Sequence, residues 1–240
     1  QSFSFKKLKI LLKYSLPLVP TDISWWIVNS SDRVIITYFL GASFNGVYAV
    51  ANKFPSIYTF IFSIYNLSWT EEISRKISAE GYEAKEYIKL VYNNTFRILA
   101  TLVLGIIICI PFVFDIFVGE NYRNAYIHIL ILLGAVFINS FSSLYGGILG
   151  AYKDTKTIGK TTLWGAVLNI IINIVLIGKI GLYAASVSTL LSYIVIYFYR
   201  KYKVNQYLKL EISKKYLICF ILIAILCIGA YISQYFIVTG

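Results

Sequence analysis

The chain has 240 residues, of which 58% are hydrophobic and only 14% are charged. Soluble globular chains carry roughly 25% charged residues, so this composition excludes an ordinary water-soluble fold. The net charge of +11 would suit either nucleic acid or a membrane surface as a partner, and the apolar excess decides for the membrane and against nucleic acid.

Apolar stretches long enough to cross a bilayer recur along the chain. A spanning helix needs about 20 mostly apolar residues, and by that measure the sequence predicts seven. Their ranges are 18–40, 46–67, 98–118, 127–149, 161–178, 182–199 and 216–238. Short breaks that contain Gly, Asn and charged residues separate several of them. We therefore expect an all-α polytopic membrane protein with about seven transmembrane helices, arranged as helical hairpins.

The positions of Lys and Arg predict the orientation of these helices. With a cytoplasmic N-terminus, seventeen of the 22 cations fall on the cytoplasmic side and two on the outer side. The segments 71–90, 150–160 and 200–215 are therefore expected to be cytoplasmic. The segment 71–90 has charges at near-helical spacing, so we expect it to form an amphipathic helix or to extend the neighbouring spans.

Polar side chains concentrate in the first two predicted spans. A charged side chain at the centre of a bilayer costs about 2.5 to 3.5 kcal/mol, so it needs a water-filled cavity or a partner. Asp22, Asn29 and Asp32 recur at helical spacing in the first span, and Asn52 and Asn66 do so in the second. The two polar stripes are therefore predicted to face away from lipid.

Arg33 and Lys53 are predicted to lie at one depth. Each is eight residues from an edge of the break at 41–45, which places both about 12 Å below the outer boundary. One interpretation is a cationic cavity that receives an anionic substrate. The other is that Arg33 pairs with Asp32 or Asp22 while Lys53 extends its side chain to the surface.

Small residues and two asparagines mark the later spans. Small residues recur every three or four positions in 127–149 and 182–199, a pattern that lets helices approach closely in lipid. Asn169 and Asn173 stand four residues apart in 161–178. Their amides are expected either to bond to a neighbouring helix or to contact a sugar hydroxyl in a cavity.

Residues for catalysis or metal binding are scarce. The single histidine is His128, and the three cysteines each stand alone in an apolar run, without the paired spacing of a zinc site or a disulfide scaffold. No phosphate-binding glycine loop of the Walker type appears. We therefore expect that the protein is not an enzyme, that it has no catalytic residue, and that it binds no metal or cofactor.

Several short motifs together resemble a known family. They are Tyr14 to Pro20, Ser24-Trp25-Trp26, Asn29, Ser31-Asp32-Arg33, Phe39-Leu40-Gly41, Gly46-Val47-Tyr48 and Ala51-Asn52-Lys53, and later Gly150 to Lys156, Asn169, Asn173 and Gly178 to Ala185. With these motifs the chain resembles Wzx-type polysaccharide flippases, which transport O-antigen or capsule repeat units. These flippases belong to the multidrug/oligosaccharidyl-lipid/polysaccharide (MOP) exporter superfamily.

The resemblance implies one lobe of a two-lobed, MATE-like transporter with an inverted-V shape. Residues 1–199 would form the six-helix C-terminal lobe, and residues 200–240 a basic cytoplasmic connection with one additional transmembrane helix. The implied partners are the missing N-terminal lobe, membrane lipids and a lipid-linked oligosaccharide, together with a polysaccharide polymerase and glycosyltransferases. The implied location is the bacterial inner membrane.

The implied function is to move undecaprenyl-pyrophosphate-linked oligosaccharides across that membrane by alternating access. The alternatives are a flippase for lipid-linked peptidoglycan precursors and a multidrug or cation antiporter, for which acidic cavity residues are expected. A membrane-embedded transferase ranks last, because convergent acid and base residues are missing. Asp22 is the candidate for coupling to an ion. The candidate substrate-binding residues are Arg33, Lys53, Asn29, Asp32, Asn52, Asn66, Asn169 and Asn173.

Overall fold

The computed structural model describes residues 19–80, 84–118 and 122–239, together with the single positions 5, 8, 12 and 15. In the first helix the side chains are described from Ser30 onward. Within the three continuous ranges the chain forms eight helices and no strand. The helices are α2 (Val19–Leu40), α3 (Ala42–Ala51), α4 (Lys53–Glu80), α5 (Ala84–Phe117), α6 (Ala125–Ala151), α7 (Thr155–Ile180), α8 (Tyr183–Val204) and α9 (Lys214–Thr239).

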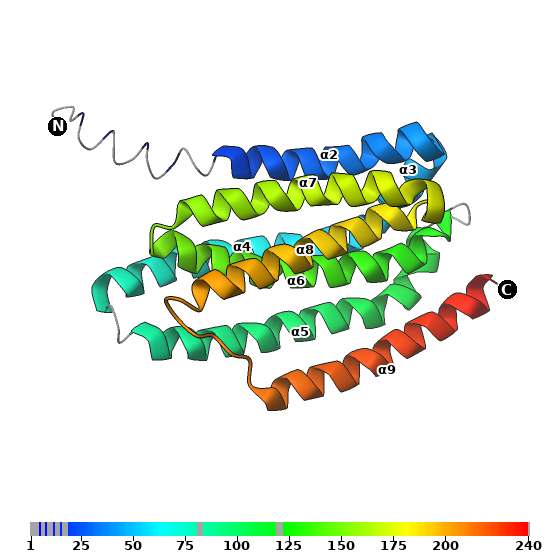
Figure 1. Ribbon diagram of the computed structural model, residues 1–240. Helices are drawn as coiled ribbons and strands as arrows, with labels where there is room; N and C mark the ends of the chain where they lie inside the picture. The colour runs from blue at the N-terminus through cyan, green and yellow to red at the C-terminus, as the bar shows by residue number, and fades with distance from the viewer. Residues whose placement is uncertain are drawn as a thin grey trace.

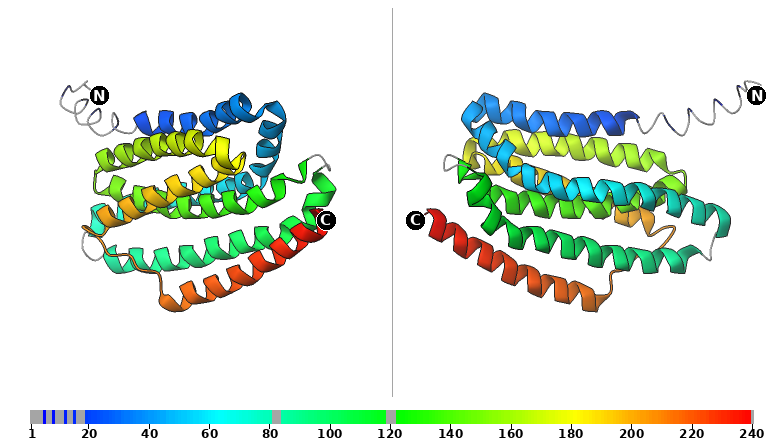
Figure 2. Two further views of the ribbon diagram at one scale, coloured as in Figure 1. Left: turned by 45° about the vertical axis from the view of Figure 1, so that its right-hand side comes forward. Right: turned by 180° about the vertical axis from the view of Figure 1, so that it is seen from behind.

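The long helices lie side by side in one bundle (Figure 1). Helix α2 lies at one edge against α7, α6 lies inside the bundle against α4 and α8, and α9 lies at the opposite edge against α5. The short helix α3 runs across one end of the bundle, as both views of Figure 2 show. The structure therefore confirms the all-helical hairpin architecture that the hydropathy pattern predicts.

The second predicted span is divided between two helices. Gly41 has φ +97, a left-handed conformation that favours glycine, and it ends α2. The chain then forms α3 and restarts as α4 at Lys53, which places Pro55 in the first helical turn. A proline is tolerated there because the N–H that it lacks would have no partner within the helix.

The segment 71–90 extends its neighbours, as one of the two sequence interpretations predicts. Helix α4 continues to Glu80 and α5 begins at Ala84, so both helices project beyond the apolar part of their spans. This end of the bundle also carries the α6–α7 turn and the connection from α8 to α9 (Figure 1). The three segments predicted to be cytoplasmic therefore lie together.

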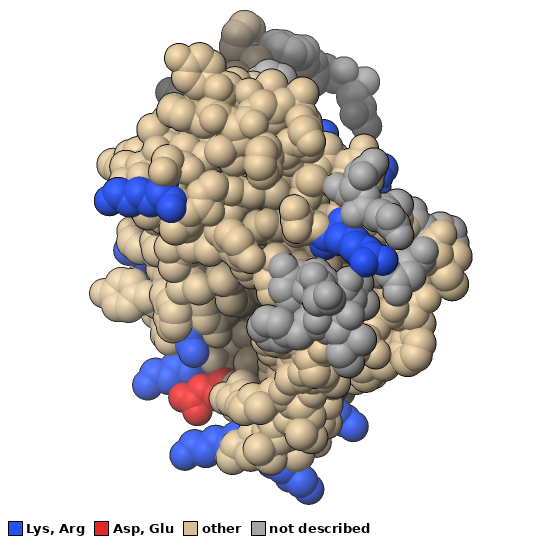
Figure 3. Space-filling model, turned by 90° about the vertical axis from the view of Figure 1, so that its right-hand side faces the viewer, with Lys and Arg blue, Asp and Glu red and all other residues tan. Residues whose placement is uncertain are grey.

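The opposite end has few charges. Figure 3 views the end that carries the α2–α3 and α7–α8 turns, and most of the described surface there is neither basic nor acidic. Within the described ranges, four helices (α5, α6, α7 and α9) are long and apolar enough to cross a membrane. Helices α2, α4 and α8 have more polar sequences, and each contributes polar side chains to the cavity described below.

Small residues allow the inner helices to approach closely. A Cβ added to Gly165 of α7 would lie 2.3 Å from Cδ1 of Ile196 on α8. A Cβ added to Gly147 of α6 would lie 3.1 Å from the ring of Trp69 on α4, whose Nε1 donates to the Leu144 carbonyl at 3.1 Å. Of the small residues for which packing is predicted, Gly146 of α6 faces the Arg200 guanidinium of α8, and Ala185, Ser188 and Ser192 of α8 are buried, as that role requires.

Arg200 is buried in the bundle, and the prediction that it belongs to an exposed cytoplasmic connection is wrong. The side chain is only 4% exposed and lies between α6, α7 and α8. Nε donates to Thr161 Oγ1 at 2.9 Å, Nη2 to Thr162 Oγ1 at 2.8 Å and Nη1 to the Ser142 carbonyl at 3.0 Å. Helix α8 also continues past position 199 to Val204, so the proposed domain boundary falls inside a helix.

The orientation can be tested by cysteine labelling after the three native cysteines are replaced by alanine. Cysteines at Ser78 and Lys156, both exposed, should react with a membrane-impermeant thiol reagent only from the cytoplasmic side. A cysteine at the exposed Asn124 should react only from outside. Labelling of position 124 from the cytoplasm alone would reverse the orientation.

Candidate functional site

The centre of the candidate site is a buried carboxylate. Asp32 lies on α2 with 3% of its surface exposed. Oδ2 accepts hydrogen bonds from Tyr48 Oη at 3.0 Å and from Thr189 Oγ1 at 3.1 Å, and Oδ1 accepts one from Asn173 Nδ2 at 2.8 Å. Helices α3, α8 and α7 therefore each supply a donor to one side chain of α2.

Asn169 completes this arrangement. With its amide nitrogen facing the carboxylate, it donates to Asp32 Oδ1 at 3.1 Å, and its oxygen accepts from the Thr189 backbone N–H at 3.2 Å. Asn169 and Asn173 are one turn apart on α7 and both are fully buried. Of the two roles left open for these asparagines, the structure favours the bonding of neighbouring helices.

Four neutral donors thus surround a charge that has no cationic partner among the described residues. A buried carboxylate with this set of hydrogen bonds is satisfied but not neutralised. Oδ1 of Asn173 is buried close by and has no hydrogen-bond partner among the described groups. Carboxylate, amide and hydroxyl oxygens are ligands that suit a proton or a small hard cation.

Asp32 borders an open cavity of about 530 Å³ between α2, α3, α4, α6 and α8. Among the described residues that line this cavity, Asp32 carries the only charge, and there is no Lys or Arg. The Oδ1 atoms of Asn66 and Asn139 are buried without a hydrogen-bond partner within the described structure. The polar lining residues are Asp32, Tyr48, Asn52, Ser56, Thr59, Ser63, Asn66, Asn139, Ser143, Thr189 and Tyr193.

The structure brings only part of the predicted site together. Asp32, Asn52 and Asn66 line the cavity. Arg33 and Lys53 are exposed and do not line it, and Arg33 instead lines a separate depression of about 410 Å³ with Thr37, Tyr38 and Asn45. The interpretation that Arg33 pairs with Asp32 is wrong, because the Asp32 carboxylate contacts the four neutral donors instead.

Two predicted residues lie outside the described side chains. The backbone of α2 includes Asp22 and Asn29, but their side-chain positions are not described. The coupling role of Asp22 and the substrate contact of Asn29 therefore stay predictions.

Sequence reasoning missed several residues of the site. Asn139 and Ser143 are four residues apart on α6, a spacing that could have identified a third polar stripe. Tyr48 stands in the motif Gly46-Val47-Tyr48, but no role was predicted for it. Thr189 gave no signal, since an isolated Thr is common in apolar helices. Their role depends on the packing of α3 and α8 against α2.

The Asp32 network can be tested by a double-mutant cycle. Asn173→Ala should lower the free energy of unfolding in detergent by about 1–3 kcal/mol, because it removes a donor from a buried charge. The same change in an Asp32→Asn background should cost less, since the charge is gone. Ser63→Ala is the control, because this hydroxyl bonds only to the Phe60 carbonyl of its own helix. Additive costs for the two network changes would contradict the direct bond.

The fold of the chain is similar to that of a known protein, a MOP superfamily transporter from Pyrococcus furiosus. That transporter is described as having a binding pocket of reversed polarity, which suggests a different function. The TM-score is 0.70 at 18% sequence identity, over 93% of this chain and 52% of that one. The chain therefore has the fold of part of a MOP transporter and spans about half of its length. No curated protein matches the chain.

The chain is an all-helical, multi-pass membrane protein, as its apolar helices and this similarity of fold indicate. A model of the family described as "Polysaccharide biosynthesis protein" matches residues 1–126, which is more than half of the sequence. On this match, the chain belongs to the polysaccharide biosynthesis protein family.

Proposed function

We propose that this chain is one lobe of a flippase that moves lipid-linked oligosaccharide repeat units from the cytoplasmic to the outer leaflet of the bacterial inner membrane. The family, which is one of polysaccharide biosynthesis, and the MOP transporter fold support this function. An undecaprenyl pyrophosphate is the proposed carrier lipid. Glycosyltransferases and a polysaccharide polymerase would act before and after the transport step.

The chemistry of the cavity carries the proposal. Sugars are neutral and present many hydroxyl groups, each of which can donate and accept hydrogen bonds. The cavity offers amides and hydroxyls for such bonds, and the buried, unpaired oxygens of Asn66 and Asn139 would accept from a sugar hydroxyl once the amide turns toward the cavity. A buried acceptor without a partner costs free energy, so a bound sugar that donates to it would be favoured.

An open cavity is expected if this chain forms one of the two lobes of a transporter. The chain spans about half of the similar transporter, and we propose that it is the C-terminal lobe, with residues 200–240 forming the added connection and helix. A second lobe would close the cavity from the side that is open here. Rocking of the two lobes would then expose the sugars to one membrane side at a time.

The cavity amides provide the direct test of this function. In cells that depend on the whole protein for surface polysaccharide, Asn66→Leu combined with Asn139→Leu should reduce export about tenfold, because two hydrogen bonds of about 0.5–1.5 kcal/mol each are lost. Asn94→Leu is the matched control, since Asn94 is exposed on α5 away from the cavity. Normal export by the double variant at an unchanged protein level would contradict sugar binding in this cavity.

The diphosphate requires cations, and we propose that Arg33 and Lys53 supply them outside the sugar cavity. Arg33→Ala or Lys53→Ala should then lower export about tenfold at an unchanged membrane level of the protein, in line with the loss of a charged hydrogen bond. Arg33→Lys should fall between wild type and Arg33→Ala, because an ammonium lacks the planar fork that binds phosphate. Lys156→Ala, on an exposed part of α7, should change nothing. If both alanine variants export normally, the cations have no role with the substrate.

One observation favours a second candidate, a multidrug or cation antiporter. The single charge on the described cavity wall is the acid Asp32, and acidic cavity residues are expected for that function. Binding of a lipophilic cation that Asp32→Asn abolishes, with polysaccharide export unchanged in the same variant, would support the antiporter. A peptidoglycan precursor also carries sugars, so only assays with defined lipid-linked substrates separate that cargo from an oligosaccharide repeat unit.

A further inference from the structure

A second polar pocket lies far from the cavity, at the end of the bundle predicted to be cytoplasmic. It has a volume of about 500 Å³ and lies between α5, the connection 205–213 and the start of α9. Lys89 and Asn93 of α5 line one side, and Ser213, Lys214 and Tyr216 line the other. The flippase proposal makes no use of this pocket.

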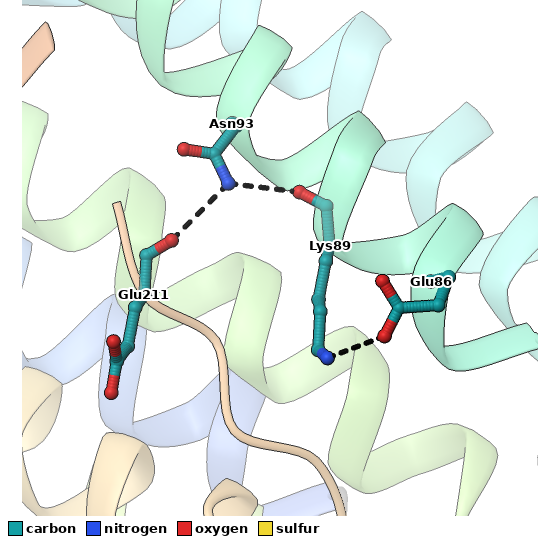
Figure 4. Close-up of polar contacts among 4 residues, drawn as sticks. All are labelled: Glu86, Lys89, Asn93 and Glu211. Carbon is teal, nitrogen blue, oxygen red and sulfur yellow. Dashed lines mark hydrogen bonds and ion pairs between the residues drawn. The ribbon is translucent and has the colours of Figure 1, made fainter. Parts of the chain in front are cut away.

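Asn93 gives the pocket a defined wall. Its Nδ2 donates to the Glu211 carbonyl at 3.2 Å and to the Lys89 carbonyl at 3.0 Å, and its Oδ1 accepts from the Ser213 backbone N–H at 2.9 Å. One side chain of α5 therefore holds the connection on both sides of position 212. Figure 4 shows Asn93 between Lys89 and Glu211, with the Glu211 carboxylate directed away from it.

The pocket lies where two neighbouring helices change from charged to apolar sequence. The guanidinium of Arg97 on α5 lies 4.8 Å from the ring centre of Tyr216 on α9, so these residues share one level. Beyond Arg97, α5 continues with the apolar run 98–114. Beyond Tyr216, α9 continues with apolar side chains that are exposed, including Leu217, Ile218 and Ile221. This level is therefore expected to be the boundary between water and hydrocarbon.

Two lysines and two acids line the pocket, Lys89 and Lys214 with Glu86 and Glu211. Further cations lie in the neighbouring sequence, at Lys209 and Lys215. Lys209, Lys214 and Lys215 are exposed, and none of them has an ion-pair partner within the described part of the chain. Lys89 pairs with Glu86 at 2.6 Å, but both side chains are well exposed. An exposed pair of this kind contributes little stability, so the pair with Glu86 does not prevent Lys89 from contacting another anion.

An apolar groove lies further along the same two helices. It has a volume of about 320 Å³ and is lined by Ile107, Ile108 and Phe112 of α5 and by Leu226 and Ala230 of α9, among others. Leu226 is twelve residues beyond Lys214, which corresponds to about 18 Å along the helix. That distance is close to half of the roughly 30 Å hydrocarbon core, the depth reached by one lipid chain.

We infer that the pocket at Lys89, Asn93 and Lys214 binds the phosphate headgroup of an anionic phospholipid of the cytoplasmic leaflet. The acyl chains of this lipid lie along the exposed apolar surface of α5 and α9, toward the groove at Leu226. Basic pockets between helices on the cytoplasmic side are suited to such headgroups. The site is independent of the transported substrate, so it can be tested without a transport assay.

The test is lipid binding by the purified chain in detergent, measured by native mass spectrometry with dioleoylphosphatidylglycerol and dioleoylphosphatidylcholine. Phosphatidylglycerol should bind more tightly than phosphatidylcholine. Lys89→Ala combined with Lys214→Ala should weaken its binding about 25-fold, at about fivefold for each lysine. The matched control is Lys156→Ala combined with Lys160→Ala, which removes two exposed lysines of α7.

Two further measurements distinguish lipid binding in this pocket from nonspecific attraction of the lipid to surface lysines. Asn93→Ala keeps every charge but removes the hydrogen bonds that hold Glu211 and Ser213 against α5. It should therefore also weaken phosphatidylglycerol binding. Inorganic phosphate at millimolar concentration should not displace the lipid. Equal binding of the two lipids, equal loss in the control variant, no effect of Asn93→Ala, or displacement by inorganic phosphate would each overturn the inference.

Discussion

The structure depends above all on the need to satisfy one buried charge. The Asp32 carboxylate lies among apolar helices, where an unpaired charge would be very costly. Hydrogen bonds from Tyr48, Asn169, Asn173 and Thr189 meet that need. Because the donors come from three other helices, one side chain links α2 to α3, α7 and α8. The same carboxylate also forms part of the cavity wall.

Arg200 is a buried positive charge that is also satisfied by hydrogen bonds to neutral groups. Its guanidinium is buried between α6, α7 and α8 and donates to hydroxyl and carbonyl oxygens, with no carboxylate among the described partners. Polar bonds therefore connect the helices around the cavity. Helix α9, in contrast, joins the bundle mainly through apolar and aromatic contacts, such as Phe220 against Phe96, with Tyr231 donating to the Tyr126 carbonyl. Polar side-chain networks thus join the helices at the centre of the bundle, and mainly apolar and aromatic contacts join α9 at its edge.

Charge is distributed unevenly over the described surfaces. The cavity has neutral amides and hydroxyls with a single acid, whereas Lys89 and Lys214 line the second pocket together with Glu86 and Glu211. Neutral amides and hydroxyls in a cavity can form hydrogen bonds with the hydroxyl groups of a sugar. Lysine side chains at the membrane boundary favour a phosphate group. The two proposed sites would therefore select different chemical groups at different depths.

The sequence by itself determined the helices and much of their polarity. The apolar stretches and the break at Gly41 are local signals that predicted the helices. The helical spacing of polar residues is a periodic signal, and it identified Asp32, Asn52 and Asn66 as residues that avoid lipid. Only the tertiary structure decided what each polar face contacts. Asp32 meets Asn173 and Thr189 across 141 and 157 residues of chain, and Arg200 lies inside the bundle although the lysines beside it in the sequence are predicted to be cytoplasmic. A helical period shows which residues share a face, but the partner of that face is set by how the helices pack.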